Sequence, residues 1–290
     1  MAGSATEMQR PPAQRGMYIL PSLFTSGNIA IGYYIIVQSI RGATLGDNWA
    51  FDRAAIAIAV AILFDGLDGR IARMTNTSSA FGRELDSLAD VITFGVAPSL
   101  LAYLWGVRLV PESGYPIIHA RLIHFGVVIC FLFLICGACR LARFNISVNP
   151  QPRNPGRPDR KYFVGLPIPA AAAMVASVVY FFGSEPLVYW PFVCGWLVLL
   201  GLLSYLMICL WRYRSFKDLN LVRPRGPLIV VVLGFVIYAI WNFSQIFLLL
   251  LSTGYVLSGI LVRLGGSVRR RILRRRTAHE HTPEPAAGAH

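Results

Sequence analysis

The chain has 290 residues, of which 55% are hydrophobic and 14% are charged. Charged groups are too few to cover a soluble globule of this size, so the composition predicts a protein embedded in a membrane. The net charge of +13 does not indicate nucleic-acid binding, because the basic residues lie between apolar segments rather than on one solvated face. We therefore expect no nucleic-acid partner.

Apolar segments recur along the whole chain. A transmembrane helix needs roughly 20 mostly apolar residues, and the predicted spans are 18–40, 49–74, 84–107, 122–142, 164–183, 188–211, 227–243 and 245–262. The last two divide one apolar stretch near residues 242–244, because a single helix over it would be roughly 54 Å long, far beyond the hydrocarbon core. The expected fold is all-α, a polytopic membrane helical bundle of about eight transmembrane helices.

The positions of Lys and Arg predict the orientation of these spans, since both residues accumulate in short cytoplasmic loops. With the N-terminus inside, only Arg41, Arg53, Arg108 and Arg121 of the 27 basic residues fall on the outer side. Both termini are therefore expected in the cytoplasm. We divide the chain into an N-terminal tail (1–17), a membrane-embedded domain (18–262) and a basic, partly disordered C-terminal tail (263–290).

Five of the 14 acidic residues lie between Asp65 and Asp90, where the second predicted span ends and the third begins. On a helix, Asp65 and Asp68 share one face, and Gly82, Asp86 and Asp90 form one stripe at i, i+4 and i+8. Two antiparallel helices can thus bring four carboxylates together. Oxygen ligands suit Mg²⁺ or Mn²⁺, so the cluster predicts a divalent-metal site, and we expect two ions.

Two other interpretations of the acidic cluster are open. The carboxylates can instead form an interfacial ion-pair network with Arg70, Arg73 and Arg83. They can also be the ion-coupling site of a transporter or channel. A coupling site is typical of the bilayer midplane and of broken helices, whereas these carboxylates lie at one cytoplasmic edge. The cost of intramembrane charge and the one-faced spacing favour a metal site.

The same residues resemble a known family. Asp65-x-x-Asp68-Gly69-x-x-Ala72-Arg73, eight further residues and Gly82-x-x-x-Asp86-x-x-x-Asp90 match every fixed position of the CDP-alcohol phosphotransferase signature. The resemblance implies a helical membrane bundle, a homodimer, and a site open to the cytoplasm. It also implies direct displacement, in which an acceptor hydroxyl attacks the lipid-proximal phosphorus of the donor and CMP leaves.

The resemblance assigns a role to each residue of the signature. The expected metal ligands are Asp65, Asp68, Asp86 and Asp90. Asp90 is also the expected catalytic residue, acting as general base on the acceptor hydroxyl. The residues expected to bind CDP and its diphosphate are Gly69, Ala72, Arg73 and Gly82.

Three further segments indicate the acceptor. Residues 20–32, 139–147 and 163–172 resemble the corresponding segments of bacterial and archaeal CDP-diacylglycerol serine O-phosphatidyltransferases, except that Ser22 stands where Asn is expected. The resemblance implies CDP-diacylglycerol and L-serine as substrates, and a prokaryotic cytoplasmic membrane as the location.

The candidate acceptor-binding residues are Arg140, Arg143 and Asn145, at the cytoplasmic mouth of the fourth span. Guanidinium groups bind carboxylates through charge-assisted hydrogen bonds. The alternative is that these residues only anchor the span at the cytoplasmic surface.

The main alternative activity is that of a sibling enzyme with glycerol 3-phosphate or an inositol phosphate as acceptor. Its phosphorylated acceptor would suit the basic residues Arg153, Arg157, Arg160 and Lys161.

Asparagine and proline residues at three positions in the apolar segments can be explained by their immediate surroundings. Asn28 either satisfies a neighbouring helix or touches the nucleotide, and Pro167 and Pro169 are interpreted as the start of the fifth helix.

Overall fold

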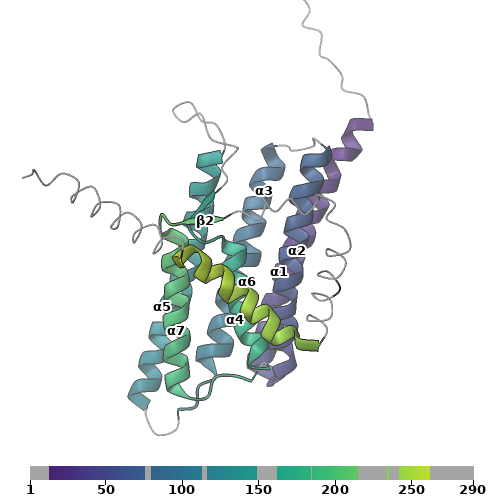
Figure 1. Ribbon diagram of the computed structural model, residues 1–290. Helices are drawn as coiled ribbons and strands as arrows, with labels where there is room; N and C mark the ends of the chain where they lie inside the picture. The colour runs from purple at the N-terminus through teal and green to yellow at the C-terminus, as the bar shows by residue number, and fades with distance from the viewer. Residues whose placement is uncertain are drawn as a thin grey trace, which may run out of the picture.

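The computed structural model describes residues 13–75, 80–112, 116–148, 162–183, 185–214, 234 and 242–261. Its helices are α1 (Ala13–Leu45), α2 (Asn48–Thr75), α3 (Ala80–Asp90), α4 (Ala97–Tyr103), α5 (Pro116–Val148), α6 (Ile168–Phe181) and α7 (Trp190–Ile208), followed by a helix at Asn242–Leu261. The π-helical segment η1 (Val91–Val96) joins α3 to α4, and a second π-helical segment, η2 (Leu104–Arg108), continues α4, so that these elements form one continuous helical rod. Figure 1 shows these elements as a bundle of long helices.

Five helical stretches in the described part of the chain are long and apolar enough to cross a membrane: Leu23–Leu45, Phe81–Arg108, Pro116–Ile146, Trp190–Ile208 and Asn242–Leu261. They coincide with predicted spans, and this identifies an integral membrane protein. Helix α2 is also long, with 28 residues, but it carries charged side chains such as Asp52, Arg53 and Asp65. Helix α2 is therefore long enough to cross a membrane, but it is less apolar than the five stretches because of its charged side chains.

The helix of the fifth predicted span, 164–183, is shorter than predicted. Helix α6 begins only at Ile168 and has 14 residues, about 21 Å at 1.5 Å per residue, fewer than the roughly 20 residues typical of a transmembrane helix. Pro167 caps it in an extended conformation and Pro169 lies in its first turn, so the interpretation of both prolines as helix-start residues is confirmed. The predicted span 227–243 lies outside the described residues, apart from Gly234, Asn242 and Phe243.

The fold contains one element that the all-α prediction did not include. Strand β1 (Tyr162–Val164), just before α6, pairs antiparallel with β2 (Arg212–Arg214), just after α7. Gly165 follows β1 with a φ of +81°, and a Cβ there would lie 2.3 Å from the Met207 carbonyl oxygen. Only glycine fits this conformation and this close approach. The ladder and Gly165 thus fasten the start of α6 to the end of α7.

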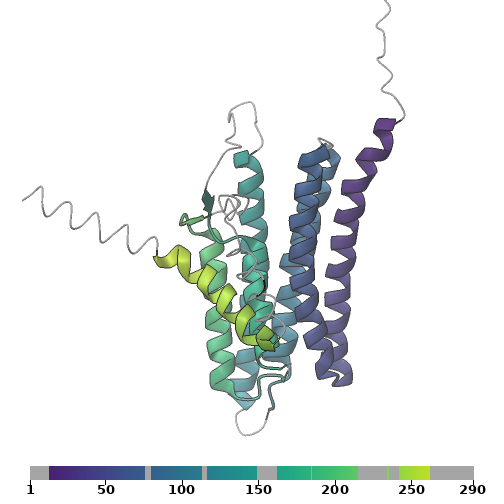
Figure 2. The ribbon, with the colours of Figure 1, turned by 45° about the vertical axis from the view of Figure 1, so that its right-hand side comes forward.

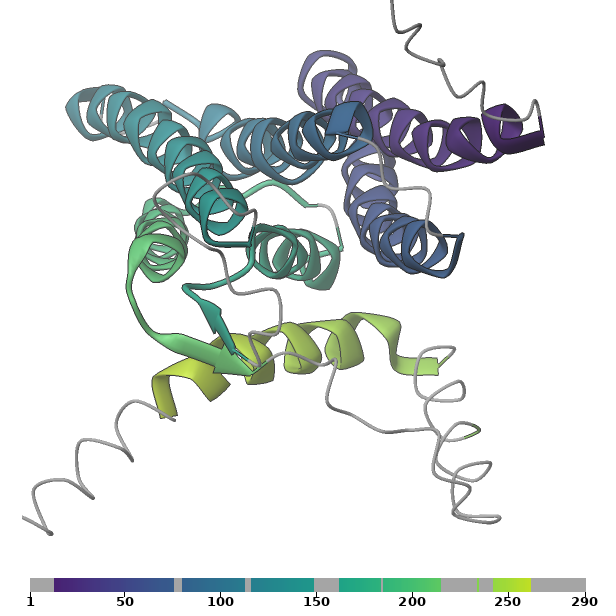
Figure 3. The same ribbon diagram turned by 90° about the horizontal axis from the view of Figure 1, so that it is seen from above.

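Successive long helices run in opposite directions through the bundle. The start of α1, the end of α2, the start of α3 and the ends of α5 and α7 lie toward the upper end of Figures 1 and 2. The helix Asn242–Leu261 does not run parallel to the others. It crosses obliquely along one side of the bundle, as the view from above in Figure 3 also shows.

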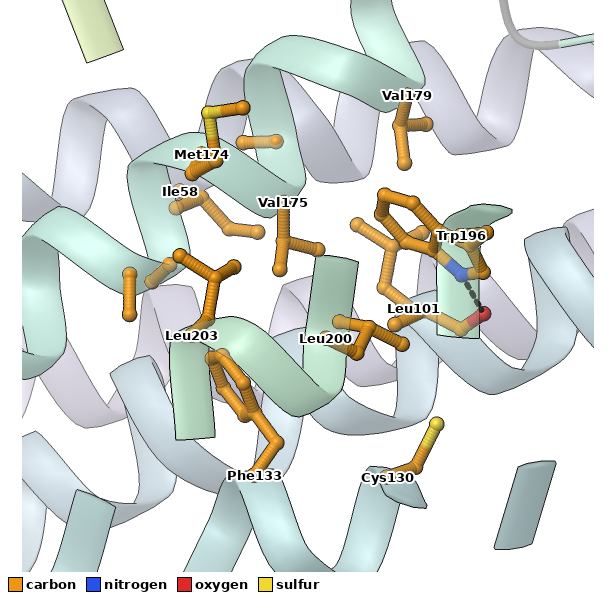
Figure 4. Close-up of a cluster of buried hydrophobic side chains, with 14 of the residues drawn as sticks. Ile58, Leu101, Cys130, Phe133, Met174, Val175, Val179, Trp196, Leu200 and Leu203 are labelled. Atoms are coloured by element: carbon orange, nitrogen blue, oxygen red, sulfur yellow. Dashed lines mark hydrogen bonds between the residues drawn. The ribbon is translucent and has the colours of Figure 1, made fainter. Parts of the chain in front are cut away.

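The core is centred on α6, although α6 has only 14 residues. Its buried side chains include Met174, Val175 and Val179, which pack with residues of α2, α4, α5 and α7 (Figure 4). The indole Nε1 of Trp196 in α7 donates a hydrogen bond of 3.0 Å to the Ala102 carbonyl. Eight of the 14 residues of α6 are buried, so this helix packs mainly against other parts of the protein.

Candidate active site

Three carboxylates meet at the end of the bundle where α2 passes into α3. One carboxylate oxygen each of Asp65, Asp86 and Asp90 lies within 4.8 Å of the other two. Asp65 comes from α2, and Asp86 and Asp90 come from successive turns of α3. All three side chains are half-buried. The spacing on two antiparallel helices therefore brings these three predicted ligands together.

Helix α1 holds the two carboxylate-bearing helices in place. Both α2 and α3 pack against α1 more extensively than against each other. The Thr93 hydroxyl, in the π-helical turn directly after Asp90, donates a hydrogen bond of 3.0 Å to the Asn28 carbonyl in α1. A Cβ at Gly32 would lie 2.7 Å from that hydroxyl oxygen, so this close approach requires glycine. The position of Asp90 thus depends on a tie between η1 and α1.

Asn28 is 3% exposed. Its backbone carbonyl accepts the hydrogen bond from Thr93, a contact that does not involve the Asn28 side chain. The side-chain Oδ1 is buried with no hydrogen-bond partner among the described residues. Both interpretations of this side chain, a bond to a neighbouring helix and contact with the nucleotide, stay predictions.

The three carboxylates together are suited to a divalent cation. Two unit charges 4 Å apart repel by about 4 kcal/mol at an effective dielectric constant of 20, so this arrangement needs positive charge. Mg²⁺ binds oxygen at about 2.1 Å, which places ligands on opposite sides of one ion roughly 4 Å apart. Because oxygen atoms within 4.8 Å of one another meet this requirement, the residues present fit a divalent metal.

The structure describes the other signature residues only in part. The backbones of Asp68, Gly69, Ala72 and Arg73 continue α2, but nothing is described of their side chains. Gly82 is half-buried in the first turn of α3, one turn before Asp86. Among the arginines of the alternative ion-pair network, Arg70 and Arg83 are exposed. Their exposure gives them little weight in balancing half-buried carboxylates.

Arg140, near the end of α5, is the most buried charged side chain of this region, at 6% exposed. Its guanidinium lies over the Phe144 ring, 5.4 Å from the ring centroid. Arg140 also interacts electrostatically with Asp90. The structure therefore places one predicted acceptor residue beside the third carboxylate.

The other two predicted acceptor residues are bonded to neighbouring helices. The Arg143 guanidinium donates hydrogen bonds to the carbonyls of Ile208 at 2.9 Å and Met207 at 3.3 Å. These carbonyls end α7 and have no partners within the helix, so Arg143 caps α7. The Asn145 amide donates a hydrogen bond of 2.7 Å to the Ser87 hydroxyl, which ties α5 to α3 between Asp86 and Asp90.

Three residues near the site were not selected from the sequence. Ser87 and Thr93 lie close to the signature aspartates in the sequence, and this proximity could have indicated that they are near the site. Tyr255, in the helix Asn242–Leu261, interacts electrostatically with Arg140. No local pattern could have connected it with residues so distant in the sequence. The basic residues considered for a phosphorylated acceptor, Arg153, Arg157, Arg160 and Lys161, lie outside the described residues.

Known proteins resemble this chain over the region that forms the site. A CDP-diacylglycerol–serine O-phosphatidyltransferase from Helicobacter pylori is 37% identical over 255 residues, covering 79% of this chain and 94% of the relative. The protein of the same description from Bacillus subtilis is 32% identical, with 69% and 93% covered. An archaetidylserine synthase from Methanothermobacter thermautotrophicus is 35% identical, with 54% and 56% covered.

The sequence model of one family, CDP-alcohol phosphatidyltransferase, matches residues 18–201. This range contains α1 to α6 and most of α7, and with them the aspartate cluster and Arg140. The match covers well over half of the chain, and it includes every position of the signature. The chain belongs to the CDP-alcohol phosphatidyltransferase family.

Proposed function

We propose that this protein is a phosphatidylserine synthase, which transfers the phosphatidyl group from CDP-diacylglycerol to the hydroxyl of L-serine and releases CMP. The observation that carries this conclusion is the similarity to proteins described as CDP-diacylglycerol–serine O-phosphatidyltransferases, which extends over 94% of the Helicobacter pylori relative. The cluster of Asp65, Asp86 and Asp90 supports it, because the donor's diphosphate requires a cationic partner.

The donor is held by the α2–α3 part of the site. Asp65, Asp68, Asp86 and Asp90 would hold the divalent metal, as two ions of Mg²⁺ or Mn²⁺. When bound, the metal would offset the charge of the diphosphate and of the departing CMP. Gly69, Ala72, Arg73 and Gly82 form the binding surface for CDP: the small residues leave room for the nucleotide, and Arg73 pairs with phosphate.

The acceptor enters beside Arg140 and Asp90. Asp90 accepts the proton of the serine hydroxyl as the oxygen attacks the lipid-proximal phosphorus. Arg140 pairs with the serine carboxylate, a small anion that a guanidinium binds with two parallel hydrogen bonds. Arg143 and Asn145 complete the acceptor pocket: Arg143 bonds to the end of α7, and Asn145 bonds to Ser87 of α3, so that both helices are held next to the acceptor.

The membrane arrangement follows from the distribution of charge. We propose eight spans within residues 18–262, both termini in the cytoplasm and the active site facing the cytoplasm of a prokaryotic cell. Support comes from the shared end of the bundle, which carries the aspartate cluster and the ends of α5 and α7, after which the sequence continues into segments rich in Lys and Arg. The protein acts as a homodimer, as the family resemblance implies, and the basic residues 263–290 bind anionic headgroups.

The decisive experiment measures CMP release by the full-length protein purified in detergent. CDP-diacylglycerol and Mg²⁺ or Mn²⁺ are supplied with L-serine, glycerol 3-phosphate, myo-inositol or inositol phosphate as the acceptor. We expect release with L-serine alone, and phosphatidylserine as the lipid product. Release with a phosphorylated acceptor instead would keep the family and overturn the proposed acceptor.

A further inference from the structure

Arg140 is a buried charge whose orientation must be set by its neighbours. A guanidinium with 6% exposure has little water around it and needs polar groups of the protein as partners. The groups that interact with it electrostatically come from three helices: Asp90 from α3, Arg143 from α5 itself and Tyr255 from the helix Asn242–Leu261. Arg143 carries a like charge and Asp90 an opposite one, whereas Tyr255 is a neutral phenol whose hydroxyl oxygen can accept a hydrogen bond from the guanidinium.

Tyr255 is brought to Arg140 by a helix that is fastened to α6. The Ser252 and Ser177 hydroxyls are 2.7 Å apart, and Ser244 lies 3.0 Å from the Tyr180 hydroxyl. Ser252 and Val256 are buried on one helix face, four residues apart, and Tyr255 lies three residues after Ser252. The oblique course of this helix across the bundle, seen in Figures 1 and 3, carries its later turns toward the ends of α5 and α7.

Tyr255 lies beyond residues 18–201, the range that the family model matches. Asp65, Asp86, Asp90 and Arg140 all lie within it. The machinery for the common donor is thus in the matched range, whereas Tyr255 is contributed from outside it. A residue of this kind is suited to adapt the acceptor side, where members that share a donor must differ.

We propose that Tyr255 is a positioning residue for the acceptor: its hydroxyl orients the Arg140 guanidinium so that Arg140 binds the carboxylate of L-serine beside Asp90. The inference rests on the proposed function and adds a residue and a helix to its acceptor pocket. It treats the helix Asn242–Leu261 as part of the active site, and not only as a membrane anchor.

The test compares Tyr255→Phe with Tyr180→Phe in the full-length protein. Each change removes one hydroxyl that lies at the junction between the helix Asn242–Leu261 and the bundle, but only Tyr255 adjoins Arg140. For Tyr255→Phe we expect the KM for L-serine to rise about tenfold, as for the loss of a hydrogen bond to a charged group, while the KM for CDP-diacylglycerol stays within about twofold. Tyr180→Phe should leave both constants near those of the unaltered protein.

A second readout uses L-serinamide, which has the hydroxyl but no carboxylate. The unaltered protein should prefer L-serine, and Tyr255→Phe should lose most of this preference. Combining Tyr255→Phe with Arg140→Gln should be no worse than Arg140→Gln alone, because Tyr255 acts through Arg140. Should Tyr255→Phe aggregate, Tyr255→Leu, which also has no hydrogen-bonding side-chain atom, takes its place in the same comparison.

The outcomes separate this inference from the proposed function. An unchanged KM for L-serine in Tyr255→Phe, or equal changes in the Tyr255 and Tyr180 variants, would overturn the role of Tyr255 and leave the synthase activity intact. Absence of serine-dependent CMP release by the unaltered protein would overturn both.

Discussion

The aspartate cluster and the surroundings of Arg140 are assembled in different ways. Asp65, Asp86 and Asp90 come from consecutive helices and meet because of their spacing and a short connection. Arg140 in α5 meets Asp90 from α3 and Tyr255 from a helix much later in the chain. The donor side of the site is thus encoded locally, whereas the acceptor side exists only once distant helices have packed. This difference explains how one signature can serve enzymes with different acceptors.

The largest effect is expected at Asp90. Asp90→Asn removes the proposed base, and turnover should fall at least about 100-fold, the lower range for general-base catalysis. Binding of CDP-diacylglycerol should stay measurable, because Asp65 and Asp86 remain. CMP release and donor binding, measured on the same preparation, test this. Normal turnover of the Asp90→Asn variant would contradict the assignment of Asp90 as the general base.

Substitutions in the aspartate cluster should change the metal concentration that the enzyme needs, whereas substitutions of acidic residues elsewhere should not. Asp65→Asn should raise the Mg²⁺ or Mn²⁺ concentration for half-maximal CMP release by about 10-fold or more, because one ligand loses its charge. The matched control is Asp47→Asn, since Asp47 pairs with Arg53 where α1 turns into α2. Equal shifts in the two variants would argue against a metal site at Asp65.

The fastening of α6 to α7 can be tested at two glycines with positive φ. Gly165→Ala combines an unfavourable φ of +81° with a Cβ 2.3 Å from the Met207 carbonyl oxygen, whereas Gly183 has a φ of +61° and nothing within 4 Å. Gly183→Ala should cost about 1 kcal/mol of stability, and Gly165→Ala clearly more. Thermal unfolding in detergent gives the order, and the reverse order would contradict the close packing at Gly165.

The smallest effect is expected where a hydrogen bond only supports the site. Ser87→Ala removes the acceptor of the Asn145 amide and loosens the tie between α5 and α3. A net value of about 0.5–1.5 kcal/mol for one hydrogen bond corresponds to a two- to tenfold fall in kcat/KM. The control is Ser204→Ala, whose hydroxyl bonds within α7 to the Leu200 carbonyl. If Ser204→Ala reduced kcat/KM as much, the tie would have no special role.

Much of the bundle could be predicted because apolar length is a local property. The segments that became α1, α5 and α7 are long apolar runs, and a chain in lipid satisfies its backbone groups within such helices. Pro167 and Pro169 correctly indicated where α6 starts. The length of α6 could not be read from hydropathy, because apolar side chains that pack against neighbouring helices, as most of those in α6 do, have the same hydropathy as apolar side chains that face lipid.

The sequence by itself determined the aspartate cluster, since helix periodicity places Asp86 and Asp90 on one face and a short connection returns the chain toward Asp65. Only the tertiary structure decided what surrounds Arg140. In the folded protein Arg143 bonds to the end of α7, Asn145 bonds to Ser87, and Tyr255 interacts with Arg140. The physical reason is that periodicity acts over a few turns of one helix, whereas contacts between distant helices depend on how their whole surfaces pack.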